Sequence, residues 1–364
     1  MVLFVCSTAY QLLNALQISQ MLNEEADLIF TTKHLQIDTD ELIQRGFFRK
    51  VYYWDELLDT FILSKCKTRR ERIIRGVKKV FRYAQIKKVY ETLPNRDQQY
   101  RVVFIAYMNY TSQCVYYYFK RTGAVLSLYD DGIYSYHCLS SKPSLFRRIA
   151  SRWLFKSYVA DEVACFYSRD SRGVDVGDHQ GIEMVDIPPF PTALSDDAIA
   201  IFGGNKSDIE AFSRRVIFFD QCFEDEYSQA LQQKITHGLY ELLGDELIIK
   251  IHPTTSGSKY DERITQVRSK VPYEIISGLI SQKDKVLISV LSTACFTPFL
   301  IKREEPSVFL AFNMLEEDNP LSKKYVDVYE RFRKEYSEGE KISAPENLQQ
   351  LLSAVKARVE KPGV

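Results

Sequence analysis

Three short polar clusters follow apolar segments of this sequence, and their residue types suit acid–base chemistry. They are Asp130-Asp131-Gly132 after the apolar run 124–128, His252-Pro253 after the run 246–251, and Ser292-Thr293 after the run 285–289. If the apolar runs are parallel strands, the clusters stand at their carboxyl ends, where open α/β sheets bind ligands. The spacing therefore predicts a functional site built from strand ends.

The acidic pair predicts a general base. A carboxylate at a strand end, held by a glycine that permits unusual backbone angles, could take a proton from a hydroxyl group, and Asp131 or Asp130 fits that description. Such a pair could also bind a divalent cation, and it could equally be an ordinary Asp-Gly turn. Because no further carboxylate cluster supports a cage of ligands, we expect no metal and no cofactor.

His252 is the candidate general acid. A lone histidine is usually structural, but this one follows a predicted buried strand, and Pro253 fixes the turn beyond it. Lys250 shares the same face of the strand because side chains alternate along it. An imidazolium and an ammonium group on one face could hold a phosphate and protonate it as it leaves.

Ser292 and Thr293 stand where a helix would begin after the third strand. Hydroxyl groups and free backbone amides at a helix N-terminus bind phosphate. An ordinary helix cap explains the same residues, and taken alone it is the simpler interpretation.

Composition narrows the class of protein. The 364 residues suit two domains, and the 48 basic residues balance 48 acidic ones, so no overall charge attracts nucleic acid. The seven cysteines form an odd set without a Cys-x-x-Cys pair, which favours a reducing compartment. Neither a signal peptide nor an apolar run of ~20 residues is evident, so we expect a cytoplasmic protein.

Strand and helix patterns alternate along the chain, which predicts a parallel α/β fold. The predicted strands are 2–6, 28–31, 51–54, 101–106, 124–128, 216–219, 247–251, 273–274, 286–289 and 307–312, and the clearest helices are 9–22, 225–243 and 346–359. We expect a first Rossmann-like domain over 1–187, a linker region over 188–213 and a second Rossmann-like domain over 214–345. The Pro-rich stretch 184–191 is the best linker candidate, and a final helix in 346–364 could cross back to the first domain. Two such lobes facing across a cleft form the glycosyltransferase B architecture.

One segment is strongly basic. Residues 65–88 contain eleven Lys or Arg and the single acid Glu71, with apolar residues between them. This segment could be an amphipathic helix that contacts an anionic membrane or glycan, or simply a solvated helix face.

Taken in order, the acidic pair with glycine, the His-Pro dipeptide and the Ser-Thr pair resemble the signatures of bacterial sialyltransferases, in particular the lipooligosaccharide type, glycosyltransferase family 52. The resemblance spans most of the chain and includes the opening strand and the turn Ser7-Thr8-Ala9-Tyr10-Gln11. It implies transfer of a nonulosonic acid such as sialic acid from its cytidine monophosphate (CMP) donor to a galactoside-type oligosaccharide of lipooligosaccharide or capsule, by one displacement with inversion and without metal.

The resemblance also implies roles for individual residues. His252 would protonate the leaving phosphate, while the donor nucleotide would be bound by Lys250, Pro253, Glu274, Ser292 and Thr293. Among these, Glu274 would bind the ribose hydroxyls. The acceptor side would include Ser7, Thr8, Gln11 and Gly132.

The identity of the base stays open at this point. Asp131 is the first choice by the family's motif, with Asp130 beside it. Some relatives take the base from the start of the second domain, where this chain has Asp220-Gln221 and Glu224-Asp225, so Glu224 or Asp225 is the second choice.

Two other functions fit the same pattern. One is transfer of another sugar, from CMP-Kdo or from a uridine diphosphate (UDP) hexose. The other is a catalytically silent glycan- or membrane-binding module of a surface-polysaccharide assembly complex. Whatever its function, the cytoplasmic protein could lie peripherally at the inner face of the cytoplasmic membrane through the basic segment 65–88. The sequence leaves open whether the chain forms a homodimer.

Overall fold

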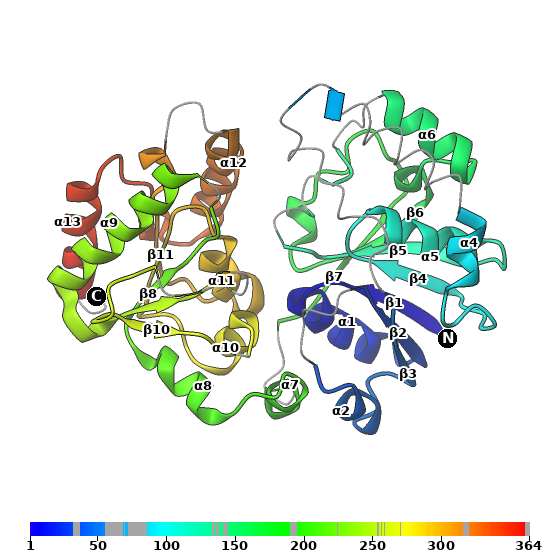
Figure 1. Ribbon diagram of the computed structural model, residues 1–364, viewed down its shortest axis with the longest axis horizontal. Coiled ribbons are helices and arrows are strands. Elements are labelled where there is room, and N and C mark those ends of the chain that lie inside the picture. The colour runs from blue at the N-terminus through cyan, green and yellow to red at the C-terminus, as the bar shows by residue number, and fades with distance from the viewer. Residues whose placement is uncertain are drawn as a thin grey trace. The chain divides into compact units, whose positions relative to one another are not determined.

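A computed structural model gives the fold of the chain (Figure 1). It describes residues 1–31, 37–54, 68, 70–71, 86–132, 135, 138–140, 145–189, 195–223, 225–252, 255, 257, 259–269, 271–315 and 320–360. The basic segment 65–88 falls almost wholly outside these residues, so the prediction of an amphipathic helix there stays a prediction. The chain divides into two compact units, Met1–Pro188 and Pro189–Val364.

The first unit is built on a parallel sheet with the strand order β3-β2-β1-β4-β5-β6-β7. The strands are β1 (Val2–Cys6), β2 (Ala26–Phe30), β3 (Lys50–Tyr53), β4 (Val102–Ile105), β5 (Val125–Tyr129), β6 (Val163–Ser168) and β7 (Glu183–Asp186). Strands β1, β2 and β4 are buried along their whole length, as expected when helices cover both faces of a parallel sheet.

Helices cover both faces of this first sheet. They are α1 (Ala9–Leu22), α2 (Thr39–Gln44), α4 (Ile86–Glu91), α5 (Tyr110–Lys120) and α6 (Leu145–Phe155), with short 3₁₀ helices at Val159–Glu162 and Ser171–Gly173. Helices α1 and α2 lie on one side of the strands, and α4, α5 and α6 lie on the other (Figure 1). This division follows from right-handed crossovers that run outward in both directions from β1 and β4.

The second unit repeats the plan with the strand order β10-β9-β8-β11-β12-β13, again all parallel. The strands are β8 (Val216–Phe219), β9 (Leu247–Lys250), β10 (Thr265–Val267), β11 (Val286–Ser289), β12 (Ser307–Leu310) and β13 (Ile342–Ser343). Because β8 and β11 are neighbours and β9 lies beside β8, the three segments that follow these strands emerge at one edge of the sheet.

The helices of the second unit include both predicted ones. The α-helices are α7 (Ser195–Ile201), α8 (Lys206–Glu210), α9 (Glu226–Leu243), α10 (Tyr273–Leu279), α11 (Thr297–Lys302), α12 (Pro320–Glu335) and α13 (Leu348–Glu360). The 3₁₀ helices are Ala211–Ser213, Gly244–Glu246, Thr293–Phe296, Phe312–Met314 and Gly339–Lys341. Aromatic stacking helps to fix them, since the rings of Phe296 and Phe332 lie 4.1 Å apart and nearly parallel.

Helix α13 packs on α9 within the second unit, and the guanidinium of Arg215 donates to the carbonyl oxygens of Arg358 and Val359. Two details of the predicted secondary structure are wrong. The predicted linker 188–213 holds α7 and α8, and Met184 belongs to β7. Residues 273–274 open α10 rather than a strand, because the apolar side chains in Tyr273–Leu279 recur at helical spacing.

None of the helices in the described ranges is both long enough and apolar enough to span a bilayer.

Candidate functional site

The acidic pair of the first unit follows β5, as predicted, but its two carboxylates have different surroundings. Asp130 is completely buried, and its carboxylate accepts hydrogen bonds from the backbone amides of Gly132 (2.7 Å) and Arg169 (3.1 Å) and from the hydroxyl of Ser168 (3.4 Å). Burial raises the pKa of Asp130, and these donors oppose that shift. The side chain of Asp130 therefore joins the ends of β5 and β6.

Asp131 is the carboxylate that remains partly exposed. The side-chain amide of Gln11, in the first turn of α1, donates to its Oδ1 at 2.6 Å, and Oε1 of Gln11 accepts from the backbone amide of Ser7 at 2.6 Å. Burial raises the pKa of Asp131 to about 6, the Gln11 hydrogen bond opposes that shift, and the charge of Asp130 adds to it. A carboxyl group with this pKa can act as a base at neutral pH.

The other predicted acceptor-side residues lie around the same strand ends. Thr8 caps α1 by accepting from the amide of Gln11 at 3.2 Å, and the hydroxyl groups of Ser7 and Thr31 lie 2.9 Å apart. Gly132 has φ +79°, and a Cβ built on it would meet no atom within 4 Å. The backbone beside Asp131 therefore borders open space.

Two polar residues of this edge were not predicted. The side-chain amide of Asn14 donates to the carbonyl oxygen of Asp130 at 2.9 Å, which ties α1 to the turn after β5. Arg169 is buried, and its guanidinium donates to the side chain of Gln17 and to the carbonyl oxygen of Pro188. Since these partners are up to 152 positions apart in the chain, no local pattern could reveal them.

The second unit also has a buried carboxylate at its centre, Asp220, directly after β8. It accepts from the backbone amide of His252 (3.0 Å), the hydroxyl groups of Thr255 (2.8 Å) and Tyr260 (2.5 Å), and the ammonium of Lys259 (2.7 Å). Burial raises the pKa of Asp220, but these donors outweigh it and the net shift is downward. Asp220 therefore holds the segment after β9 in place.

Lys250 and His252 lie together at the end of β9, and the structure confirms that strand. The ammonium of Lys250 makes no hydrogen bond or ion pair with any residue in the described parts of the chain. Its pKa is lowered by burial, although attraction to Glu274 and Asp220 opposes that shift. The pKa of His252 is also lowered, first by burial and then by the charge of Lys250. A bound anion would stabilise the charged forms of both side chains.

Glu274 lies in the first turn of α10 and is partly exposed, and its charge acts on Lys250. Ser292 and Thr293 follow β11, where Ser292 caps the 3₁₀ helix by accepting from the amide of Ala294 at 3.3 Å. The ordinary helix cap that the sequence allowed is thus present, and both hydroxyl residues are partly exposed.

Gln221 connects the turn after β8, which contains Asp220, with the turn after β11, which contains Ser292. Its side-chain oxygen accepts from the amide of Leu291 at 2.6 Å and from the hydroxyl of Ser289 at 3.3 Å. Gln221 directly follows Asp220, so the turns after β8 and β11 are fastened to each other and, through Asp220, to the turn after β9. The three strand ends thus form one connected polar group.

The remaining candidates are less informative. Asp225 is exposed and caps α9 by accepting from the amide of Ser228 at 2.7 Å, an interaction that lowers the pKa of Asp225. Glu224 and Pro253 lie outside the described residues. In the ranges that the structure covers, no three His, Cys, Asp or Glu side chains are grouped so that they could hold a metal ion.

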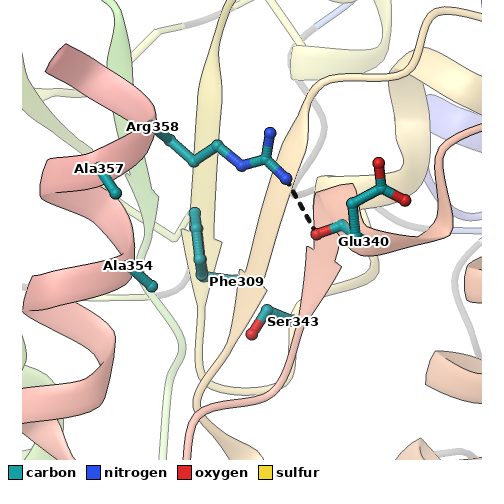
Figure 2. A pocket seen from close by; sticks show the side chains of 6 residues that line it. All are labelled: Phe309, Glu340, Ser343, Ala354, Ala357 and Arg358. Carbon is teal, nitrogen blue, oxygen red and sulfur yellow. Dashed lines mark hydrogen bonds between the residues drawn. The ribbon is translucent and has the colours of Figure 1, made fainter. Parts of the chain in front are cut away.

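A pocket in the second unit lies apart from these residues (Figure 2). It is formed by Phe309, Glu340, Ser343, Ala354, Ala357 and Arg358. The guanidinium of Arg358 donates to the carbonyl oxygen of Glu340 at 3.1 Å across it. The pocket contains none of the candidate acid, base or phosphate-binding residues.

The two parallel sheets, of seven and six strands, give the chain the glycosyltransferase B fold. Among solved structures, a protein described as UDP-N-acetylglucosamine 2-epimerase from Listeria monocytogenes superposes with a TM-score of 0.53 at 9% identity, over 99% of this chain and 88% of that one. UDP-GlcNAc 2-epimerase from Neisseria meningitidis, solved with UDP-GlcNAc bound, gives 0.52 at 11% identity, over 99% and 98%.

A calicheamicin glycosyltransferase superposes with a TM-score of 0.48 at 8% identity, over 99% of this chain and 98% of that one. At 9% and 11% identity, the similarity to the two epimerases establishes the fold alone. No protein-family model and no curated protein matches the sequence. The chemistry must therefore be argued from the residues of the site.

Proposed function

We propose that this protein is an inverting glycosyltransferase that moves sialic acid from CMP-sialic acid to a galactoside-type acceptor of a bacterial surface glycan. The observation that carries the proposal is the pair Lys250 and His252 at the end of β9. Both have a lowered pKa, and Lys250 has no ion-pair partner in the described residues. A phosphate group bound beside them would stabilise the charged form of each side chain.

The second unit is the proposed donor side. The phosphate of the donor would be bound by Lys250, by His252 and by the hydroxyl groups of Ser292 and Thr293. Glu274 is partly exposed and begins α10, so its carboxylate is available for the ribose hydroxyl groups. Binding of the phosphate raises the pKa of His252 again, because a nearby anion favours the imidazolium. The histidine would then carry the proton that the leaving group needs.

The first unit is the proposed acceptor side, with Asp131 as the base. Its pKa of about 6 leaves it ionised at neutral pH, and Gln11 orients its carboxylate. We prefer Asp131 to Asp130 as the base, because Asp130 is buried and engaged by three donors. Asp225 is the weaker alternative, because its carboxylate caps α9.

The proposed reaction is a single displacement. Asp131 takes the proton of an acceptor hydroxyl, and the oxygen forms a bond to the anomeric carbon as the bond from that carbon to the phosphate oxygen breaks. His252 gives its proton to the departing CMP. Acid–base catalysis of this kind contributes roughly 10²–10⁴-fold, and alignment and electrostatics supply the rest.

A UDP-sugar donor is the second candidate. It is favoured by the similarity to the Neisseria meningitidis epimerase, which was solved with UDP-GlcNAc. Titration calorimetry separates the two candidates, since the proposal expects CMP to bind at least tenfold more tightly than UMP or UDP. Tighter binding of UDP would transfer the proposal to the uridine donors.

The reaction itself is tested by incubating the protein with CMP-sialic acid and a lactoside acceptor. The proposal expects sialylated product and free CMP from the wild-type chain, with the yield greatly reduced in His252→Ala and Asp131→Asn. The matched control is His237→Ala, because His237 is an exposed histidine of α9 away from the strand ends. Normal CMP binding without product would favour the silent binding module.

A further inference from the structure

Helix α6 carries apolar side chains on the side where a surface helix normally carries polar ones. Trp153 is 68% exposed and Ile149 is 59% exposed, and they are among the most exposed large apolar residues in the described part of the chain. They are four positions apart in Leu145–Phe155, so they lie next to each other on one face.

The opposite face of α6 is the one that packs. The ring of Phe155 stacks on Tyr117 of α5 with centroids 4.3 Å apart, and the hydroxyl of Ser151 donates to the carbonyl oxygen of Ser157 at 3.0 Å. A position two residues away on a helix lies about 200° around its axis. Trp153 stands two residues from both Ser151 and Phe155, so it points away from the body of the unit.

Basic residues flank this apolar face. Arg148, Arg152 and Lys156 recur at four-residue intervals and are all exposed. From 132 to 160 the sequence contains no Asp or Glu, against the five basic residues Lys142, Arg147, Arg148, Arg152 and Lys156. Exposed tryptophan and isoleucine side chains beside a row of basic residues, in a stretch of sequence without Asp or Glu, are typical of a helix that lies in the interface of an anionic bilayer.

We propose that α6 docks on the surface of an anionic phospholipid membrane, with Trp153 and Ile149 entering the headgroup region and Arg148 and Arg152 contacting lipid phosphates. The charge of the surface favours this occupant over a second copy of the chain, because two such faces would bring arginines together. The inference does not depend on the proposed glycosyl transfer, and it concerns residues separate from the basic segment 65–88.

The tryptophans allow a direct test. The chain has two of them, and Trp54 is only 6% exposed, so Trp54→Phe leaves Trp153 as the single reporter. With vesicles containing 30% phosphatidylglycerol, the emission of Trp153 should shift to shorter wavelength and be quenched by lipids brominated on their acyl chains. Unchanged emission would overturn the proposal. The Trp153→Phe variant, which keeps only the buried Trp54, should show no shift.

Co-sedimentation of the full chain with the same vesicles measures the contribution of charge. Arg148→Gln with Arg152→Gln should weaken partitioning by roughly 20-fold, since each basic residue contributes roughly fivefold at an anionic surface. The matched control removes two charges from α12 through Arg333→Gln with Lys334→Gln, both exposed, and should bind like the wild type. Equal losses in both variants would contradict a specific role for α6.

Two further outcomes would overturn the proposal. Equal binding to phosphatidylcholine vesicles would show that charge plays no part. Sedimentation velocity of the wild type that shows a dimer, abolished by Trp153→Ala, would assign the face to a second copy instead. A thermal melt of each variant confirms that it is folded, since Trp153 has little packing to lose.

Discussion

Replacing Gln11 should move the acid limb of the pH–activity profile toward higher pH. The amide of Gln11 donates to Asp131 at 2.6 Å, and this hydrogen bond stabilises the ionised carboxylate. Methionine has a similar shape but no donor, so Gln11→Met should raise the pKa of Asp131 above its value of about 6. Because a base works only when ionised, the variant should need a higher pH for the same activity.

The size of the shift follows from the strength of the bond. A hydrogen bond to a charged group contributes about 1.5–3 kcal/mol, and the lower value applies because Asp131 is partly exposed. Since ~1.36 kcal/mol corresponds to one pKa unit, the limb should move by about 1 unit. At pH 6 the ionised fraction would fall from about one half to about one tenth, a roughly fivefold loss of kcat/KM, with little loss near pH 8.5.

The assay is sialyl transfer from CMP-sialic acid to a lactoside across a series of buffers from pH 5 to 9 at constant ionic strength. The control variant is Gln113→Met, because the amide of Gln113 donates to the carbonyl oxygen of Met108 at 2.8 Å and, among the residues that the structure describes, hydrogen-bonds no carboxylate. Its profile should keep the wild-type limb. A thermal melt at each pH separates lost folding from lost ionisation.

An acid limb that stays in place in Gln11→Met, with the variant folded, would refute the assignment of Asp131 as the base. A uniform loss of activity at every pH would refute it as well, because it would give Gln11 a purely structural role. A limb that moves by about 1 unit in Gln11→Met and not in Gln113→Met supports the assignment.

Four more outcomes are expected. His252→Ala should lower single-turnover rates by about 10²–10⁴-fold while calorimetry shows nearly unchanged CMP affinity; equal rates would remove His252 from the mechanism. Lys250→Met should weaken CMP binding by about 10–100-fold, because the phosphate loses a charged donor. The variant should also have a higher Tm, because it no longer has to bury an ammonium group. Tighter CMP binding would contradict the proposed phosphate site. Asp220→Ala should lower the free energy of unfolding by about 3–5 kcal/mol, measured with urea at pH 7, because it leaves buried donors without an acceptor. In the wild type, the stability that Asp220 contributes should disappear as the pH falls through the lowered pKa of this carboxyl group. Asp131→Asn should raise the free energy of unfolding by about 2–3 kcal/mol at pH 7.5, and this gain should vanish near pH 4. The reason is that a carboxyl group with a raised pKa destabilises the fold only at a pH where it is ionised. A gain that does not depend on pH would contradict the raised pKa of Asp131.

The strands that were predicted are short apolar runs bounded by polar residues. Strands β6, β10 and β13 were not predicted, and β10 is a short Thr-Gln-Val segment without an apolar run. Val216–Phe219 was predicted with its observed bounds, and the ends of β9 and β11 fell within one residue of the prediction. The failures have physical causes. Strand β7 was taken for part of a linker because Pro188 and Pro189 follow it so closely, and α10 is too short for its period to stand out.

The positions of the candidate residues at the ends of strands were predictable, but their hydrogen-bond partners were not. The sequence places Asp130 and Asp131 side by side, and only the structure reveals that Ser168 and Arg169 donate hydrogen bonds to Asp130. Gln11 meets Asp131 across 120 positions. A single sequence carries no signal for such contacts, because they depend on strand order and not on local spacing.

The central claim is tested most directly by a crystal structure of the full chain with CMP bound. The account predicts that the phosphate contacts the ammonium of Lys250 and the imidazole of His252, with the ribose hydroxyl groups near Glu274 and the hydroxyl of Ser292 within hydrogen-bond distance of a phosphate oxygen. A nucleotide bound elsewhere, with Lys250 and His252 contacting no part of it, would contradict the account.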